Sequence, residues 1–150
     1  MRVLKKIAIM LVIVLIGIQF VPTTYNASDN VSETDFVNIF NVPHDIKNLL
    51  KTSCYDCHSN NTHYPWYSKI QPAAWIMEGH INDGIKELNF STFGDYSGRR
   101  KKSKLKSIIS QIRDDEMPIS SYIFIHRNAK LSEKDKFMLD KCLNNLRDSL

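Results

Sequence analysis

The run Cys54-Tyr55-Asp56-Cys57-His58 decides the fold and chemistry of this 150-residue chain. Two cysteines three positions apart, followed directly by a histidine, are the attachment signature of c-type haem. One helical turn separates the cysteines, so their sulfurs can reach the two vinyl groups of one porphyrin, and His58 can bind the iron. Chance would produce this run about 0.002 times in such a chain. We therefore expect one covalent haem c, with Cys54 and Cys57 as attachment sites and His58 as an axial ligand.

Three other interpretations of this run remain. A dithiol redox motif needs a thioredoxin-like βαβ pattern, which the sequence lacks. A structural zinc site needs a second ligand pair at close spacing, and only His63 and His80 lie nearby. A disulfide across two intervening residues is possible but strained. The pattern favours haem over all three.

The second axial position of the iron decides what the haem does. Met117 is the first candidate, because it follows an amphipathic helix and precedes Pro118, so its thioether can be held rigidly in a loop. Ligation by histidine and methionine raises the reduction potential. His80 is the fallback ligand and would give a bis-histidine site. The structural alternative for Met117 is a loop methionine that fills a packing gap.

Aromatic residues crowd the segment after the cysteine run, at Tyr64, Trp66, Tyr67 and Trp75. Aromatic rings pack well against a porphyrin. We expect Trp66 and Trp75 to line the haem pocket, with ordinary core packing as a nearly equal alternative.

The first 22 residues are typical of a targeting segment. Arg2, Lys5 and Lys6 precede a run from Ile7 to Val21 that carries no charge. This layout predicts a secretory signal or a membrane anchor over residues 1–22, and the uncleaved anchor is favoured because no convincing cleavage site follows. The basic flank places the remainder outside the cytoplasm. We expect an exported protein, anchored in the inner membrane facing the periplasm, or periplasmic if the signal is cleaved.

Apolar spacing predicts four helices in the rest of the chain. They run from Pro43 into the cysteine run, onward from Pro72, over residues 100–113, and from an N-cap at Ser132. Strand signals are scarce, and the best is the short stretch from Tyr122 to Ile125. The apolar residues expected to face the core are Val42, Ile46, Leu49, Leu50, Ala74, Met77, Ile81, Ile85, Leu88, Leu105, Ile108, Ile109, Ile112, Leu139, Cys142, Leu143 and Leu146.

These helices predict an all-α domain over residues 42–150, and with the cysteine run we expect it to surround one haem in a manner similar to cytochrome c. A hydrophobic helix within residues 1–22 and a polar tether over residues 23–41 precede it. By analogy with class I cytochromes c, the first and last helices of the domain would pack as the pair that holds the haem. Cys142, on the apolar side of the last helix, is expected to be a buried free thiol, with an intermolecular disulfide as the minor alternative.

The charge balance argues against a nucleic-acid partner. The net charge is +4, but removing the three N-terminal positive residues from the 20 basic ones leaves 17 against 16 acidic residues. Nucleic-acid binders show a strong basic excess on one face. Six of the eight residues from Arg99 to Lys106 are basic; we favour a solvated helix face over a docking patch for an acidic redox partner.

The run at 54–58, continued by Ser59-Asn60-Asn61, Tyr64-Pro65-Trp66-Tyr67 and Ile70-Gln71-Pro72, resembles a family of small bacterial haem-binding domain proteins. The blocks that look like the same family further on are His80-Ile81, Leu88-Asn89-Phe90, Glu116-Met117-Pro118, Tyr122, His126 and Ala129-Lys130-Leu131-Ser132. The resemblance covers about residues 36–148. It implies the same attachment sites and axial histidine, and a membrane segment at the N-terminus.

The family's Met-Pro block is similar to the distal-methionine loop of class I cytochromes c, which strengthens Met117 as the second ligand. The family brings no well-defined reaction. We expect an electron carrier rather than an enzyme, passing single electrons between unidentified redox partner proteins. The alternatives are a haem-based sensor or ligand-binding module with an open iron position, and a small haem peroxidase.

Overall fold

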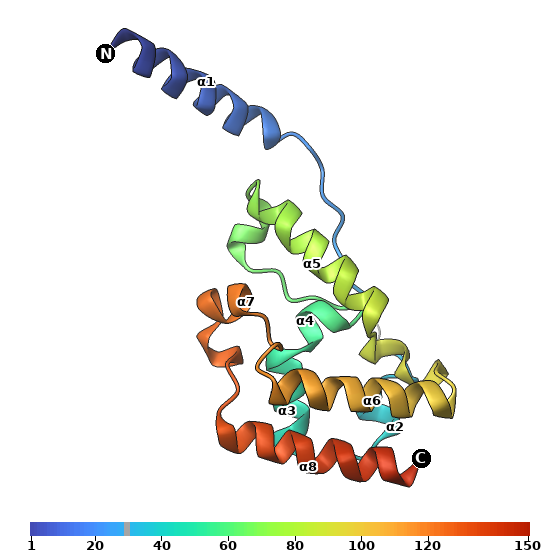
Figure 1. Ribbon diagram of the computed structural model, residues 1–150. Helices are drawn as coiled ribbons and strands as arrows, with labels where there is room; N and C mark the ends of the chain where they lie inside the picture. The colour runs from blue at the N-terminus through green and yellow to red at the C-terminus, as the bar shows by residue number, and fades with distance from the viewer. Residues whose placement is uncertain (29–30) are drawn as a thin grey trace.

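The computed structural model describes residues 1–28 and 31–150, and this part of the chain contains helices and no strand, which confirms the all-α prediction. Figure 1 shows the arrangement of the helices. The α-helices are α1 (Arg2–Ile18), α2 (Phe36–Ile39), α3 (His44–Ser53), α4 (Tyr55–His58), α5 (Ala73–Glu87), α6 (Gly98–Arg113), α7 (Ser120–Ile125) and α8 (Glu133–Ser149). Three short 3-10 helices are η1 (Trp66–Lys69), η2 (Phe90–Asp95) and η3 (Arg127–Ala129).

The four predicted helices correspond to α3, α5, α6 and α8. Pro43 precedes α3 with φ −55° and ψ 149°, an extended backbone from which a helix readily starts. Ser132 and Asp135 form the predicted capping box at the start of α8, in which each side chain accepts a backbone N–H of the other residue. α6 begins slightly earlier than predicted, because the Ser97 side chain accepts from the Arg100 N–H.

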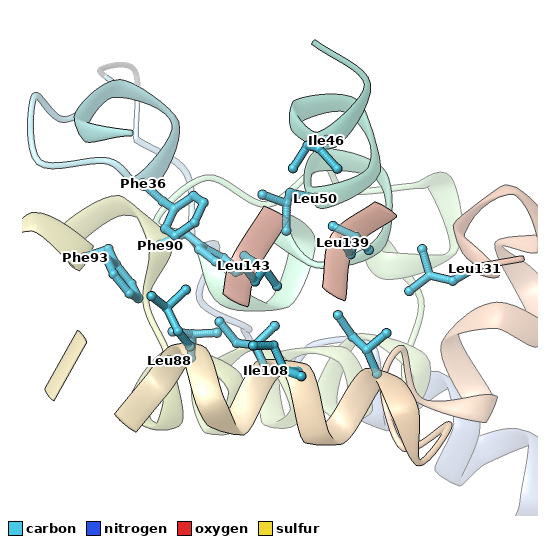
Figure 2. Packing of buried hydrophobic residues seen from close by; sticks show 13 residues of the cluster. Phe36, Ile46, Leu50, Leu88, Phe90, Phe93, Ile108, Leu131, Leu139 and Leu143 are labelled. Atoms are coloured by element: carbon cyan, nitrogen blue, oxygen red, sulfur yellow. The ribbon is translucent and has the colours of Figure 1, made fainter. Parts of the chain in front are cut away.

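The core forms where α3, α6 and α8 meet (Figure 1). α6 and α8 lie alongside each other, and α8 also contacts α3, so the predicted packing of the first and last domain helices is present. Figure 2 shows Leu50 of α3, Ile108 of α6 and Leu139 of α8 pointing into a common apolar layer. Leu50 and Leu139 are completely buried. The apolar spacing of α6 was predicted correctly, and its buried residues are Leu105, Ile108, Ile109 and Ile112.

The stretch predicted as the best strand is helical. Tyr122 to Ile125 belongs to α7, in which the Tyr122 and Ile123 N–H groups donate to the Ile119 carbonyl. No strand in the described ranges lies beside it, so this short segment satisfies its backbone groups locally instead.

The N-terminal segment does not meet the prediction of a membrane anchor. No helix among residues 1–28 and 31–150 is long and apolar enough to cross a membrane. α1 ends at Ile18, because Gln19 follows in a turn and exchanges hydrogen bonds with the Gln71 backbone. With Lys5 and Lys6 inside its first turns, only residues 7–18 of the helix are uncharged, about 18 Å against a hydrocarbon core of about 30 Å. The predicted location at the inner membrane, facing the periplasm, is therefore wrong.

The structure also places part of the predicted tether in the core. Phe36 of α2 is completely buried, with its ring centroid 5.4 Å from that of Phe90 and 5.0 Å from that of Phe93. Asp35 is buried beside it and accepts a 2.7 Å hydrogen bond from the Tyr55 hydroxyl. The packed domain thus begins before residue 42. Positions 29–30 of the predicted tether lie outside the described residues.

Candidate functional site

The cysteine run lies where two helices meet at an angle. Cys54 ends α3 and starts α4 with φ −129° and ψ −42°, and its carbonyl accepts hydrogen bonds from the Cys57 and His58 N–H groups. The run therefore forms a single turn between α3 and α5 (Figure 1). Cys54, Cys57 and His58 are all half-buried, and both cysteines are free thiols.

Burial keeps the two thiols protonated. Desolvation raises the pKa of Cys54 to about 12, with a further contribution from Cys57. Desolvation also raises the pKa of Cys57 to about 11, with a smaller contribution from Asp56. The thiolate is the nucleophilic form of cysteine, so burial lowers the reactivity of both free thiols. Within the described residues, no cluster of three or more His, Cys, Asp or Glu side chains is arranged to hold a metal ion.

His58 is oriented by the backbone of α5. Its Nδ1 lies 2.8 Å from the Gly84 carbonyl oxygen and 3.1 Å from the Leu88 carbonyl oxygen. A carbonyl only accepts, so Nδ1 carries the hydrogen and donates it, which leaves the lone pair of the neutral ring on Nε2. Metal-binding histidines are commonly oriented this way, because a hydrogen bond from one ring nitrogen fixes the other as the ligand.

Gly84 allows α5 to approach the cysteine run this closely. A Cβ placed on Gly84 would lie 2.4 Å from the Cys57 carbonyl oxygen, a distance that no side chain could occupy. The glycine thus allows the Gly84 carbonyl to reach His58. Sequence reasoning missed this residue; the available signal was an isolated glycine inside a helical pattern, which lowers helix stability and therefore calls for a packing reason.

Two cavities share part of their lining, including residues of the cysteine run, and together we call them the cleft. The first has a volume of about 820 Å³ and the second about 690 Å³, both counted out into the open solvent at their mouths. Cys54, His58 and Met117 line both. The first is mainly apolar; its apolar lining includes Leu88, Phe90, Ile108, Ile112, Pro118 and Leu131. Cys57, His80 and Tyr122 line the second cavity.

Met117 reaches the cleft through the turn that follows α6. Asp115 has φ 57°, a left-handed conformation that aspartate tolerates better than most residues, and its carboxylate pairs with Lys136 at 2.6 Å. The Glu116 and Met117 N–H groups then both donate to the Gln111 carbonyl. This turn brings a residue 59 positions after His58 into the same cavities.

Trp66 and Trp75, predicted to line the pocket, are placed elsewhere. Neither contributes to either cavity of the cleft. Trp66 is 75% exposed on η1, and Trp75 is 37% exposed on α5. Their aromatic neighbour Tyr67 instead hydrogen-bonds His126. Cys142 is half-buried in α8, away from the cleft.

Polar residues also line the first cavity, and of these only Lys104 belongs to a pattern singled out in the sequence, the basic run from Arg99 to Lys106. Lys104 of α6 lies 3.8 Å from the Glu87 carboxylate of α5, and both line this cavity with Ser107 and Gln111. Among the residues that line the two cavities, Lys104 is the only lysine or arginine. The spacing of Lys104, Ser107 and Gln111 on one helix side was visible in the sequence, but what that side faces was not.

The donor set fits a haem. The cleft combines apolar walls for a porphyrin, two thiols beside one imidazole with a free Nε2, a thioether lining the same cavities, and a lysine paired with the Glu87 carboxylate. Each of these groups has a counterpart in c-type haem binding: vinyl groups for the thiols, iron for nitrogen and sulfur, and carboxylates for the lysine.

Comparison with known proteins gives one result. The family model described as a haem-binding domain matches residues 13–145. The searches of curated proteins and of solved structures gave no match.

Proposed function

The chain belongs to the haem-binding domain family, and from this premise we propose that it carries one covalent haem c and transfers single electrons. The orientation of His58 is the observation that carries the proposal. Because Nδ1 donates to the Gly84 carbonyl of α5 and to the Leu88 carbonyl that follows α5, Nε2 would be available to iron.

Cys54 and Cys57 would hold the porphyrin. Each thiol would add across one vinyl group, with a C–S bond formed and the thiol hydrogen placed on the other vinyl carbon. The addition needs no oxidant. Both cysteines are free thiols that line the cleft, which supports this role.

Met117 is the proposed second axial ligand, because its side chain lines both cavities together with His58. His80 lines the second cavity only and is the alternative ligand. Lys104 would pair with the carboxylates of the haem at the mouth of the first cavity, where it lies with Ser107 and Gln111.

Bound haem supplies an iron centre that alternates between ferric and ferrous states. The chain's part is to fix both axial positions and to surround the iron with apolar side chains, which favours electron transfer over reactions that need an open iron position. The family resemblance to class I cytochromes c at the Met-Pro block supports the same assignment. An open sixth position would instead favour a sensor or a peroxidase.

Haem attachment is tested on a denaturing gel stained for haem. The chain should keep its colour when denatured, and Cys54→Ala with Cys57→Ala should lose it. Cys142→Ala is the matched control and should keep the colour, because Cys142 lies outside the cleft. Colour retained by the double variant would refute thioether attachment.

The sixth ligand is tested on the haem-loaded chain. Met117→Ala should alter the ferric absorption spectrum and lower the reduction potential, because a thioether stabilises ferrous iron. His80→Ala should change neither. An unchanged spectrum in Met117→Ala would refute methionine ligation, and rapid peroxide turnover by the unaltered protein would overturn the electron-carrier assignment.

A further inference from the structure

Asp56, the second residue between the two cysteines, connects the cysteine run to α7. The Tyr122 hydroxyl donates to its Oδ2 at 2.7 Å. The His63 N–H donates to its Oδ1 at 3.1 Å, and the Thr62 hydroxyl donates to its backbone carbonyl at 2.6 Å. Asp56 is thus held by its own loop and presents one oxygen to a helix 66 residues away. None of these contacts has a part in the function proposed above.

A second connection reaches the same helix from η1. The Tyr67 hydroxyl is hydrogen-bonded to His126 Nε2, and the His126 ring stacks on Tyr122 with centroids 4.4 Å apart and an interplanar angle of 11°. Tyr122 is therefore fixed at its hydroxyl by Asp56 and on its ring face by His126. Tyr122 also lines the second cavity with Met117 and His58.

Apolar packing does little to hold α7 in place. α7 has no fully buried residue, and Phe124 and Ile125 are 81% and 58% exposed. α7 begins three residues after Met117, so Met117 lies between this helix and the turn in which the Gln111 carbonyl accepts the Glu116 and Met117 N–H groups. Hydrogen bonds to a charged group contribute more than neutral ones, and a half-buried Tyr–Asp bond is accordingly a major restraint here.

We propose that Tyr122 is a positioning residue: through its hydrogen bond to Asp56 it holds segment 114–126 closed over the cleft and thereby places Met117. The proposal rests on the function proposed above for the role of Met117, but the position of the segment is measurable without reference to ligation.

The test compares Tyr122→Phe with Tyr55→Phe in the haem-loaded full chain. The two changes are matched: each removes one tyrosine hydroxyl that donates to an aspartate at 2.7 Å, and Tyr55 lies next to Asp56 in the same motif. Tyr55, however, bonds Asp35 near α2 and not the methionine segment.

Amide hydrogen exchange is measured by peptide for each variant. Tyr122→Phe should accelerate exchange in peptides covering residues 114–126 about tenfold, equivalent to about 1.4 kcal/mol of opening free energy. Tyr55→Phe should leave those peptides unchanged and accelerate exchange around residues 35–40. Equal exchange of segment 114–126 in Tyr122→Phe and the unaltered chain would overturn the proposal, as would an equal acceleration in both variants.

The ferric absorption spectrum is the second measurement, because it reports ligation of the iron by Met117. A purely structural role of Tyr122 would leave this spectrum unchanged. Tyr122→Phe should shift part of the population toward the spectrum of Met117→Ala, and Tyr55→Phe should not. If Met117→Ala has an unaltered spectrum, methionine ligation fails, while the exchange result still decides whether Tyr122 holds the segment. Should Tyr122→Phe load haem poorly, Tyr67→Phe weakens the second connection and should accelerate exchange in the same segment; no acceleration there would count against the proposal.

Discussion

At the scale of single residues, the site depends on atoms whose roles are fixed by their partners. His58 offers Nε2 because two backbone carbonyls occupy Nδ1, and no carboxylate takes part in that hydrogen bond. A carbonyl carries only a partial charge, so the imidazole is oriented without a full negative charge beside it. Lys104 is the only Lys or Arg that lines the two cavities, and it lies 3.8 Å from the Glu87 carboxylate, which lines both.

Replacing Lys104 with Gln should lower the reduction potential of the haem-loaded protein. Removing a positive charge at the edge of the cleft disfavours the state that holds the extra electron, by an amount on the order of tens of millivolts. Lys102→Gln is the control, because Lys102 is exposed on the same helix and lines neither cavity. Redox titration of both variants measures the two reduction potentials. Equal shifts in Lys104→Gln and Lys102→Gln would show that Lys104 has no particular effect on the haem.

At the scale of elements, the approach of α5 to α4 determines whether the imidazole can be oriented. The approach is possible because α5 presents a bare backbone at Gly84, directly against the Cys57 carbonyl. The same helix has a second glycine, Gly79, where a Cβ would meet nothing within 4 Å. Replacing each of these glycines with alanine should consequently change the stability of the protein in opposite directions.

Gly84→Ala should destabilise the protein by about 1–3 kcal/mol, because the added methyl group overlaps a backbone atom that cannot move independently. Gly79→Ala should stabilise it by up to about 1 kcal/mol, since alanine has the higher helix propensity and space is available. Denaturant unfolding of both variants provides the comparison. A stabilising Gly84→Ala would show that the two helices are further apart than described here.

At the scale of the whole molecule, the cleft is assembled from segments that are distant in the sequence. α3 and α4 supply the cysteine run, α5 supplies the carbonyls that orient His58, and α6 with the turn after it supplies one wall and Met117. α6 is in turn packed on α8. The packed unit extends back to Phe36, whereas α1 has no buried residue and lies away from the other helices (Figure 1).

Two shortened chains should therefore behave differently. A chain that begins at residue 19 should unfold within about 0.5 kcal/mol of the full chain, because α1 buries nothing. A chain that begins at residue 42 loses Phe36 and the Asp35–Tyr55 hydrogen bond, and should lose at least about 3–5 kcal/mol of stability. Chemical unfolding of the haem-loaded chains measures both. Equal stability of the two would restore residue 42 as the start of the domain.

Local signals in the sequence predicted the elements well, and long-range contacts explain the errors. The spacing of Leu105, Ile108 and Ile112 identified the buried side of α6, and Ser132 identified the start of α8. By contrast, nothing near Phe36 indicates that Phe90 and Phe93 will surround it. The cysteine run could be recognised by itself, but the roles of Gly84 and Tyr122 depend on which helices come to lie beside it.

Tyr55 and Asp56, the two residues between the cysteines, are spacers in the haem signature. Each nevertheless forms a side-chain hydrogen bond with a different residue that is distant in the sequence. Tyr55 is bonded to Asp35 and Asp56 to Tyr122. A change at either position leaves a buried or half-buried polar partner unsatisfied, which is costly. Among related sequences, positions 55 and 35 should therefore co-vary, as should positions 56 and 122. Substitutions within this short motif should thus be accompanied by substitutions at residues far outside it.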